Sequence, residues 1–328
     1  MSVSLSVAAT DLKDQKNQDP IAIQPPADMV PDNLIWLDTS NLEPHYVFVA
    51  DKENRTLSVW HRDGQDFSLY GAFPMDIGKN VGDKNSPGDA KTPEGAYIIQ
   101  TRLEGKTLNF GDYGVRAFTL DYPNYFDHLA KKTGSGIWLH AIPDTKSLLR
   151  GSRGCVVVRN EIIQKLTPLI ALKKTPLIIV NRVNYVTRDK IAEIRKSLTD
   201  WLTGWQNAWQ NKDLEKYISH YSDSFNGEYK TLKMSKRKWY EYKAFLAKKY
   251  SFIKVNLGEP YIITRKDDAI IRFIQNYESD SLKDSGEKTL YLRRNSSGHY
   301  EILTELWTAL NDNTLIEGST APAGRAAK

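Results

Sequence analysis

Cys155 is the residue with the clearest chemical potential, because it is the only cysteine in this chain of 328 residues. It lies in the stretch GSRGCVVVRN, directly before a run of valines that predicts a buried strand. A thiol attacks an acyl carbon well only as the thiolate, so it needs a neighbouring base or cation. His140, near the end of the predicted strand GIWLHAI, is the natural base. The loop 141–154 is long enough to lay the two strands side by side, about 4.8 Å apart.

The turn before the cysteine supplies further groups that acyl transfer requires. The backbone amides of Gly154 and Cys155 can converge on one point and form an oxyanion hole. Arg153 and Arg159 flank the cysteine and can hold a substrate carboxylate through bidentate contacts. A cysteine beside valines also fits a buried structural residue, since free cysteine is among the most buried residue types. The residues alone leave both interpretations open.

The elements around this pair are predicted to be mainly strands. Short apolar and polar runs such as YVFVAD, TLSVWH and FSLYGAF, separated by turn signals, are typical of strands. A glycine-rich loop, DIGKNVGDKNSPGDAKTPEG, leads into the strand AYIIQT, and Asn160 is a predicted N-cap for the helix EIIQKL. We therefore expect a mainly-β domain at residues 45–184, preceded by a polar, proline-containing arm at residues 1–44.

The second half of the chain has a different pattern. Apolar residues recur at steps of three and four, which predicts a long helix: Leu198, Trp201, Leu202, Trp205 and Trp209. The segment KRKWYEYKAFLAKKY predicts another helix, with Trp239, Tyr242 and Phe245 on its buried face. Four strand-like runs with turn signals follow, so residues 185–312 are expected to form an α+β domain. Residues 313–328 are predicted to be a disordered tail.

Composition narrows the possible partners. The net charge of +5 is too small for a dedicated nucleic-acid binder, although it suits an anionic polymer. The basic and aromatic segment at residues 233–249 fits an amphipathic helix better than a nucleic-acid platform. No apolar run is long enough to span a bilayer, and the N-terminus lacks the pattern of a complete secretory signal. The histidines show no metal-binding spacing, so neither a metal nor a cofactor is expected.

The segment GSGIWLHA, followed by GSRGCVVVRNE, resembles the catalytic signature of the L,D-transpeptidase (YkuD-like) family. The loop GKNVGDKNSPGDAKTPEGAY resembles the second hallmark of that family, and the likeness covers roughly residues 45–182. The resemblance implies a mainly-β catalytic sandwich in which Cys155 is the nucleophile and His140 the base. It also implies that the Ala141 carbonyl orients the imidazole.

The same resemblance assigns roles to the residues around the nucleophile. The amides of Gly154 and Cys155 would form the oxyanion hole, and Ser152 would support the loop. Ser152, Arg153, Arg159 and Trp138 are the candidates for substrate binding. Arg153 departs from the family pattern, where histidine is commoner, and this departure concerns substrate positioning rather than the nucleophile.

The chemistry that the resemblance implies is acyl transfer on peptidoglycan stem peptides. Cys155 would attack the carbonyl of the third residue and release the terminal D-alanine, leaving a thioester. Resolution by the amine of a neighbouring stem gives a 3–3 cross-link, and this L,D-transpeptidase activity is the leading prediction. Resolution by water would make the protein an L,D-carboxypeptidase; release of a lipoprotein and a non-catalytic scaffold are further alternatives. Such a substrate places the protein in the periplasm, with its leader absent from this chain.

The segment WQNAWQNKDLEKYISHYSDSF and the runs after it resemble the nuclear transport factor 2-like (NTF2-like) fold, over about residues 195–310. This resemblance implies an α+β cone with a pocket for an unknown ligand, because the fold alone does not define a function. The order of the two domains is similar to that of cell-shape-determining L,D-carboxypeptidases of curved and helical bacteria. That similarity suggests a homodimer formed through the N-terminal arm.

Overall fold

The computed structural model describes residues 19–34, 45–64, 66–229, 232–265 and 267–310. These residues form two compact units, which divide between Ile191 and Ala192. The first unit is built mainly from strands and the second combines helices with an antiparallel sheet. The two fold classes predicted for the two halves of the chain are confirmed.

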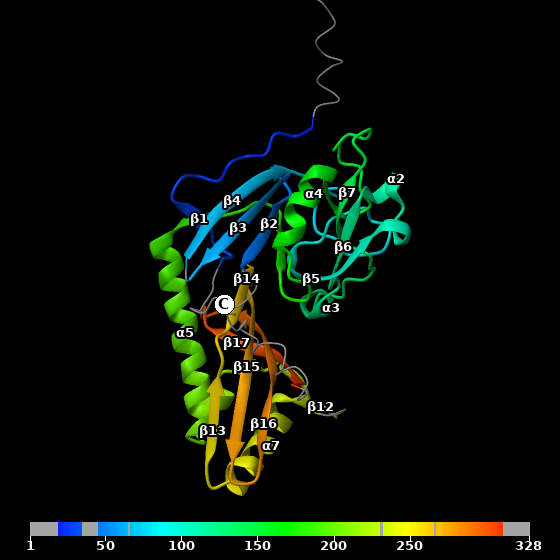
Figure 1. The fold of residues 1–328 in the computed structure, drawn as a ribbon. Helices are drawn as coiled ribbons and strands as arrows, with labels where there is room; N and C mark the ends of the chain where they lie inside the picture. Colours follow the sequence, from blue (N-terminus) through cyan, green and yellow to red (C-terminus); the bar gives the residue numbers. More distant parts are fainter. Residues whose placement is uncertain (1–18, 35–44, 65, 230–231, 266, 311–328) are drawn as a thin grey trace, which may run out of the picture. The chain divides into compact units, whose positions relative to one another are not determined.

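A curled sheet of eight strands forms the body of the first unit (Figure 1). Its neighbours are antiparallel except for two parallel pairs, β2 with β9 and β7 with β8. In spatial order the strands are β4 (Asp66–Pro74), β3 (Thr56–Asp63), β2 (Tyr46–Asp51), β9 (Pro176–Val180), β5 (Gly95–Glu104), β6 (Arg116–Leu120), β7 (Trp138–Ile142) and β8 (Val156–Arg159).

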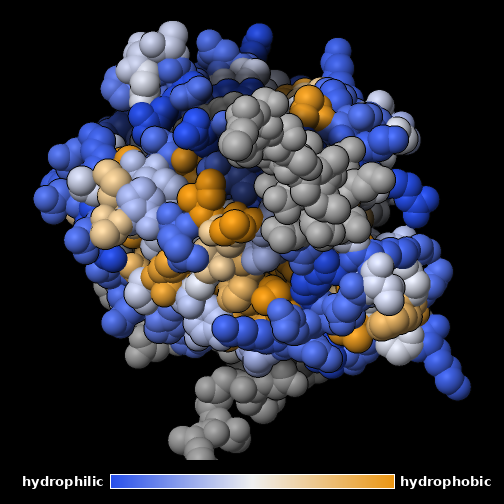
Figure 2. Space-filling model, turned by 90° about the horizontal axis from the view of Figure 1, so that it is seen from above, coloured by the Kyte–Doolittle hydropathy of each residue, from blue (hydrophilic) through white to orange (hydrophobic). Residues whose placement is uncertain are grey.

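The core of this unit follows from the apolar faces of these strands. Phe48, Val59, Tyr97 and Phe118 are fully or almost fully buried within it. A register shift between Ile99 and Arg102 interrupts the β5–β6 ladder. Such bulges bend a strand, so this one contributes to the curl of the sheet. With the large apolar side chains inside, hydrophilic residues predominate on the face shown in Figure 2, and hydrophobic residues form small groups there.

Short helices connect the strands of the first unit. They are α2 (Phe110–Tyr113), α3 (Tyr125–Leu129) and α4 (Asn160–Leu166). The prediction that Asn160 caps α4 is wrong, because the helix begins at Asn160 and the capping position is Arg159. The Asn160 side chain instead accepts a hydrogen bond from the Val115 amide at 2.9 Å. It therefore ties α4 to the segment before β6.

The described part of the predicted arm lies against the first unit. β1 (Met29–Pro31) pairs antiparallel with β10 (Tyr185–Thr187), and Asp19 forms an ion pair with Arg159. The dimerisation proposed for residues 1–44 remains a prediction. Residues 1–18 and 35–44 and the predicted tail at residues 313–328 lie outside the described residues.

The second unit packs its helices against an antiparallel sheet. α5 (Arg188–Gln210) begins in the first unit and α6 (Leu214–Ile218) follows after a turn, in which the Asp213 side chain accepts from the Lys216 amide. Along the chain, a hairpin of β11 (Asn226–Tyr229) and β12 (Leu232–Ser235) comes next, followed by α7 (Lys236–Lys249) and the main sheet. That sheet has the order β13 (Ile253–Leu257), β15 (Asp268–Ser279), β16 (Lys283–Arg294) and β17 (Tyr300–Ala309), and β14 (Tyr261–Arg265) also pairs with β15.

The apolar pattern of the helices is largely confirmed. Trp205, Trp209 and Tyr217 are buried, and the Trp205 ring meets Phe273 of β15 with centroids 6.1 Å apart. The prediction for Phe245 is wrong, because its side chain is 62% exposed. The residues of α7 that are buried are Trp239 and Lys243.

Charged side chains lie inside the second unit. Lys288 and Glu305 form a buried ion pair at 2.6 Å, and Glu305 also accepts a hydrogen bond from Tyr221 at 2.8 Å. Lys243 lies over the rings of Trp209 and Trp239, at 4.3 and 4.6 Å from their centroids. Burial lowers the pKa of Lys243 to about 7, although the negative charge of Glu305 opposes this shift.

Removal of Glu305 is predicted to destabilise the second unit strongly. In Glu305→Ala the buried Lys288 loses its counter-charge, so the free energy of unfolding should fall by about 3–5 kcal/mol. Glu278→Ala is the control, because it breaks an exposed pair with Lys283 and should leave stability nearly unchanged. Chemical denaturation followed by tryptophan fluorescence measures both variants. Equal losses in the two variants would contradict this account of the buried pair.

Candidate active site

The parallel pairing of β7 with β8 brings Cys155 and His140 to one face of the sheet. His140 lies opposite Val157 in this ladder. Cys155 precedes Val157 by two residues, and residues two apart along an extended chain point to the same side. Both Cys155 and His140 line one cavity of about 790 Å³, which is of the size that binds small ligands.

His140 is held in one orientation. Its Nδ1 lies 2.6 Å from the carbonyl oxygen of Ala141. Because a carbonyl can only accept, Nδ1 carries the proton and Nε2 of the neutral ring is left as the acceptor. Tyr113 packs edge-on against the imidazole, with centroids 5.0 Å apart. The ring is therefore fixed in the tautomer that a general base requires.

The imidazole is buried, whereas Cys155 is only partly buried in the cavity wall. Burial raises the pKa of Cys155 to about 11, and the Trp138 amide and the charges of Arg153 and Lys84 only partly oppose it. Burial also lowers the pKa of His140 to about 4, against the hydrogen bond to Ala141. At neutral pH the pair therefore rests as a neutral thiol and a neutral imidazole. Such an imidazole can take the thiol proton as the sulfur attacks.

The turn before Cys155 is fixed by the Ser152 side chain. Its hydroxyl donates to the Cys155 carbonyl at 2.8 Å and accepts from the Gly154 amide at 3.1 Å. The Gly154 amide is thus already engaged by the loop, whereas the sequence predicted it as an oxyanion donor. Cys155 itself points its sulfur to within 3.6 Å of the Gly136 carbonyl.

The candidate substrate-binding residues divide into two groups. Ser152 and the exposed Arg153 line the cavity. Trp138 and Arg159 are not among the described residues that line it. The Trp138 ring lies against Tyr113, with centroids 4.9 Å apart.

The expectation that Arg159 holds a substrate carboxylate is not supported by its position. Its Nε donates to Asp19 at 2.6 Å, and the guanidinium also contacts the carbonyls of Pro143 and Lys146. Asp19 additionally accepts from the Leu148 amide at 3.3 Å. Arg159 therefore fastens the loop after β7 to the N-terminal segment instead of facing the cavity.

Several residues that line the cavity were not singled out from the sequence. Asp76 is buried, accepts from the Gly151 amide at 2.9 Å and pairs with Arg55 at 3.0 Å. Lys84 and Tyr113 lie on separate connecting segments and reach the cavity wall only in the folded chain. The only feature of the sequence that could have indicated Lys84 is the glycine-rich loop in which it lies.

Within the described ranges we find neither a metal-binding cluster nor a membrane-spanning helix. Among these residues no group of three or more His, Cys, Asp or Glu side chains is placed to hold a metal ion. No helix in the same part of the chain is both long enough and apolar enough to cross a membrane.

The thiol is predicted to be slow to alkylate at neutral pH. Because its pKa is raised to about 11, the rate with iodoacetamide should rise about tenfold per pH unit from pH 7 to 10. Free cysteine, with a pKa of about 8.5, is the reference and should level off above that pH. Mass spectrometry of the single-cysteine chain follows the reaction. A rate for Cys155 that is already at its plateau at pH 7 would indicate a thiolate–imidazolium pair instead.

Gly154 is predicted to tolerate no side chain. Its φ is +132°, and an added Cβ would lie 2.7 Å from the Lys91 carbonyl oxygen. Gly154→Ala should therefore lower the free energy of unfolding of the first unit by about 2–4 kcal/mol. Gly64 also has a positive φ, of +59°, but this lies in the left-handed region that side chains tolerate, and an added Cβ meets no atom within 4 Å, so Gly64→Ala should cost only about 1 kcal/mol. Denaturant unfolding compares them, and similar losses would show that the contact with Lys91 is unimportant.

Two protein-family models match the chain, one for each unit. An L,D-transpeptidase catalytic domain (YkuD) matches residues 45–179, and a Cds6 C-terminal NTF2-like domain matches residues 197–306. Among curated proteins no match is found.

Solved structures resemble the chain over both domains. Bd1075 of Bdellovibrio bacteriovorus is 41% identical, with a TM-score of 0.78 over 87% of this chain and 100% of that one. Pgp2 of Campylobacter jejuni, a helical cell shape determining protein, is 27% identical, with a TM-score of 0.64 over 80% of this chain and 91% of its own. The chain belongs to the family that joins an L,D-transpeptidase (YkuD) catalytic domain to a C-terminal NTF2-like domain.

Proposed function

We propose that this protein cleaves the terminal D-alanine from peptidoglycan tetrapeptide stems through a thioester on Cys155. The observation that carries the proposal is the shared cavity of Cys155 and His140, with the imidazole held by Ala141 in the tautomer of a base. The L,D-transpeptidase family model supports the substrate class. This substrate also supports a periplasmic location, which we propose with it.

The first half-reaction transfers the stem from D-alanine to the sulfur. As the Cys155 sulfur attacks the carbonyl carbon of the third residue, His140 Nε2 takes the thiol proton. The C–N bond then breaks and the same proton passes to the leaving nitrogen, so D-alanine departs as a neutral amine. Because the Gly154 amide already donates a hydrogen bond to the Ser152 hydroxyl, we assign the Cys155 amide as the donor to the oxyanion.

The second half-reaction depends on what reaches the thioester. Attack by an amine of a second stem gives the 3–3 cross-link that was the leading prediction from the sequence. Attack by water gives a tripeptide. The likeness to Pgp2 over both domains favours water, since trimming of stems is the role that the sequence resemblance connected with cell shape. We therefore propose L,D-carboxypeptidase activity first and transpeptidase activity second.

Incubation with purified disaccharide tetrapeptide tests both half-reactions. The wild-type protein should release D-alanine and leave a tripeptide, as seen by mass spectrometry. Cys155→Ala should reduce the rate at least about a thousand-fold, and His140→Ala about a hundred-fold or more. Glu278→Ala, a surface variant of the other unit, is the control and should retain full activity.

The products separate the alternatives. Dimers joined between two third residues would identify transpeptidation, and release of a peptide from a lipoprotein-linked stem would identify lipoprotein cleavage. Unchanged tetrapeptide that still binds the wild-type protein would identify a scaffold and overturn the proposal of an enzyme.

A further inference from the structure

A buried lysine lines the cavity in which Cys155 lies. Lys84 is only 3% exposed, yet it forms part of the cavity wall. Its ammonium donates to the Ser86 carbonyl at 3.0 Å and to Asp89 Oδ1 at 2.7 Å. An ammonium has three N–H groups, so these bonds leave one for a molecule that enters the cavity.

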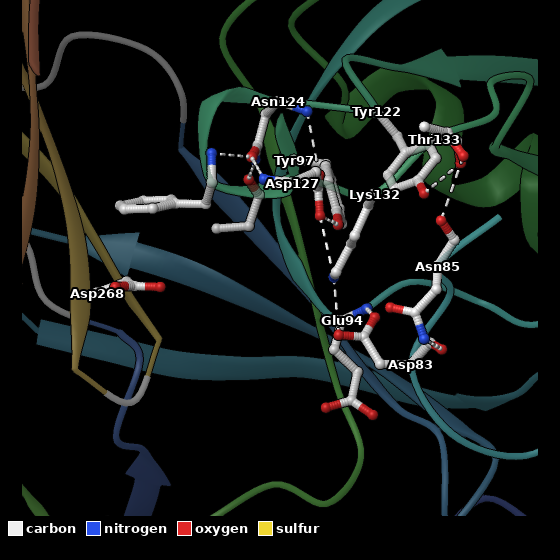
Figure 3. Close-up of polar contacts among 12 residues, drawn as sticks. Asp83, Asn85, Glu94, Tyr97, Tyr122, Asn124, Asp127, Lys132, Thr133 and Asp268 are labelled. Carbon is white, nitrogen blue, oxygen red and sulfur yellow. Dashed lines mark hydrogen bonds and ion pairs between the residues drawn. The ribbon is translucent and has the colours of Figure 1, made fainter. Parts of the chain in front are cut away.

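The backbone on both sides of Lys84 is anchored to the rest of the unit (Figure 3). Lys132 joins Asp83 to Asp127 of α3, with ion-pair distances of 2.7 and 3.1 Å. The carbonyl of Asn85 accepts from the Thr133 amide at 2.9 Å. Because Lys132 and Asp127 are buried, solvent competes little with the ion pairs that hold this loop.

The carboxylate of Asp89 compensates the positive charge of Lys84, but it is not directed toward the cavity. The Asp89 carboxylate accepts from the amides of Asn85, Ser86 and Lys91, at 2.8 to 3.1 Å. Burial alone would raise the pKa of Asp89, but Lys84 and these amides hold it well below its usual range. The carboxylate is thus fully engaged within its own loop and fixes the position of the lysine.

The other cations of the cavity wall are less fixed. Arg153 is exposed, and the Lys146 side chain is about half exposed, with a hydrogen bond to the Gly111 carbonyl and a contact of 3.7 Å to Asp112. Arg159, the residue that the sequence suggested for a substrate carboxylate, does not line the cavity and is paired with Asp19. A charge whose position is set before binding loses less entropy when it meets a ligand. Among the described residues that line the cavity, Lys84 is the cation that is both buried and held by a close ion pair, to Asp89 at 2.7 Å.

The geometry points to Lys84 as the specificity-determining cation that binds a carboxylate of the stem peptide, and this inference rests on the proposed function. A tetrapeptide stem presents a carboxylate on its terminal D-alanine and another on the side chain of a diaminopimelate third residue. We assign the terminal one, because it distinguishes a chain end from an internal peptide bond. Lys84 would thereby restrict cleavage to the last residue of the stem.

A double-mutant cycle between enzyme and substrate tests this contact. The substrates are the tetrapeptide with a free terminal D-alanine and the same peptide ending in D-alaninamide. The enzymes are wild type and Lys84→Gln, with Lys84→Arg as the conservative variant. Lys79→Gln, an exposed lysine in the same loop that is not part of the cavity lining, is the matched control.

The contact predicts a non-additive loss of kcat/KM. Wild type should cleave the amide about 10- to 100-fold less efficiently than the acid, as expected for a lost charged hydrogen bond. Lys84→Gln should cleave the acid as poorly as wild type cleaves the amide, and should no longer distinguish the two. Lys84→Arg should restore part of the preference, and Lys79→Gln should behave like wild type.

The other outcomes are equally decisive. If Lys84→Gln still prefers the acid over the amide by the same factor as wild type, the two changes act independently. Lys84 would then not contact the terminal carboxylate. A stem with lysine in place of diaminopimelate lacks the side-chain carboxylate. If the losses are non-additive for the change from diaminopimelate to lysine instead, Lys84 binds the side-chain carboxylate of the third residue. The assignment to the terminal carboxylate of D-alanine would then be wrong. If wild type cleaves no tetrapeptide at all, the proposed function fails before this inference is reached.

Discussion

The position of Cys155 depends on a backbone clamp between two segments that are far apart in the sequence. Asp76 and Val157 exchange a pair of backbone hydrogen bonds, at 2.7 and 2.8 Å, and the Lys79 amide donates to the Ser152 carbonyl at 2.9 Å. Between these bonds the turn of Ser152 to Gly154 has little freedom, since Ser152 also bonds the backbone of the turn itself. The Cys155 sulfur therefore lies directly before the start of β8, in a position fixed by contacts that do not involve the thiol or the imidazole.

The same clamp joins the nucleophile to the loop that follows Lys79. The Gly78 amide donates to the Thr92 hydroxyl at 2.8 Å, and the Lys91 carbonyl lies directly beside Gly154. Any shift of this loop would therefore move both the cavity wall and the turn that carries the cysteine. Close packing of this kind favours one arrangement of the site, because intermediate positions lose contacts on both sides.

Burial has opposite consequences in the two units. At the candidate active site it raises the pKa of the Cys155 thiol and lowers that of the His140 imidazole, and both shifts favour the neutral groups. In the second unit the charges of Lys288 and Glu305 are retained in the interior because they pair at 2.6 Å. Burial alone would raise the pKa of Glu305, but the charges of Lys288 and Lys243 lower it. An ion pair of this kind stabilises poorly but is costly to break.

The sequence by itself determined the two fold classes, and it singled out Cys155 and His140 as the candidate reactive pair. Cys155 and His140 could be proposed as a pair because residue type, the spacing between them and the resemblance of the flanking motifs are all local, and strand or helix periodicity is also local. Tertiary structure decided the rest. Arg159 is withdrawn from the cavity by Asp19, 140 residues earlier in the chain. Lys243 is buried and Phe245 exposed, although periodicity favoured the aromatic residue. Partners and burial depend on contacts between distant segments, and no local pattern specifies them.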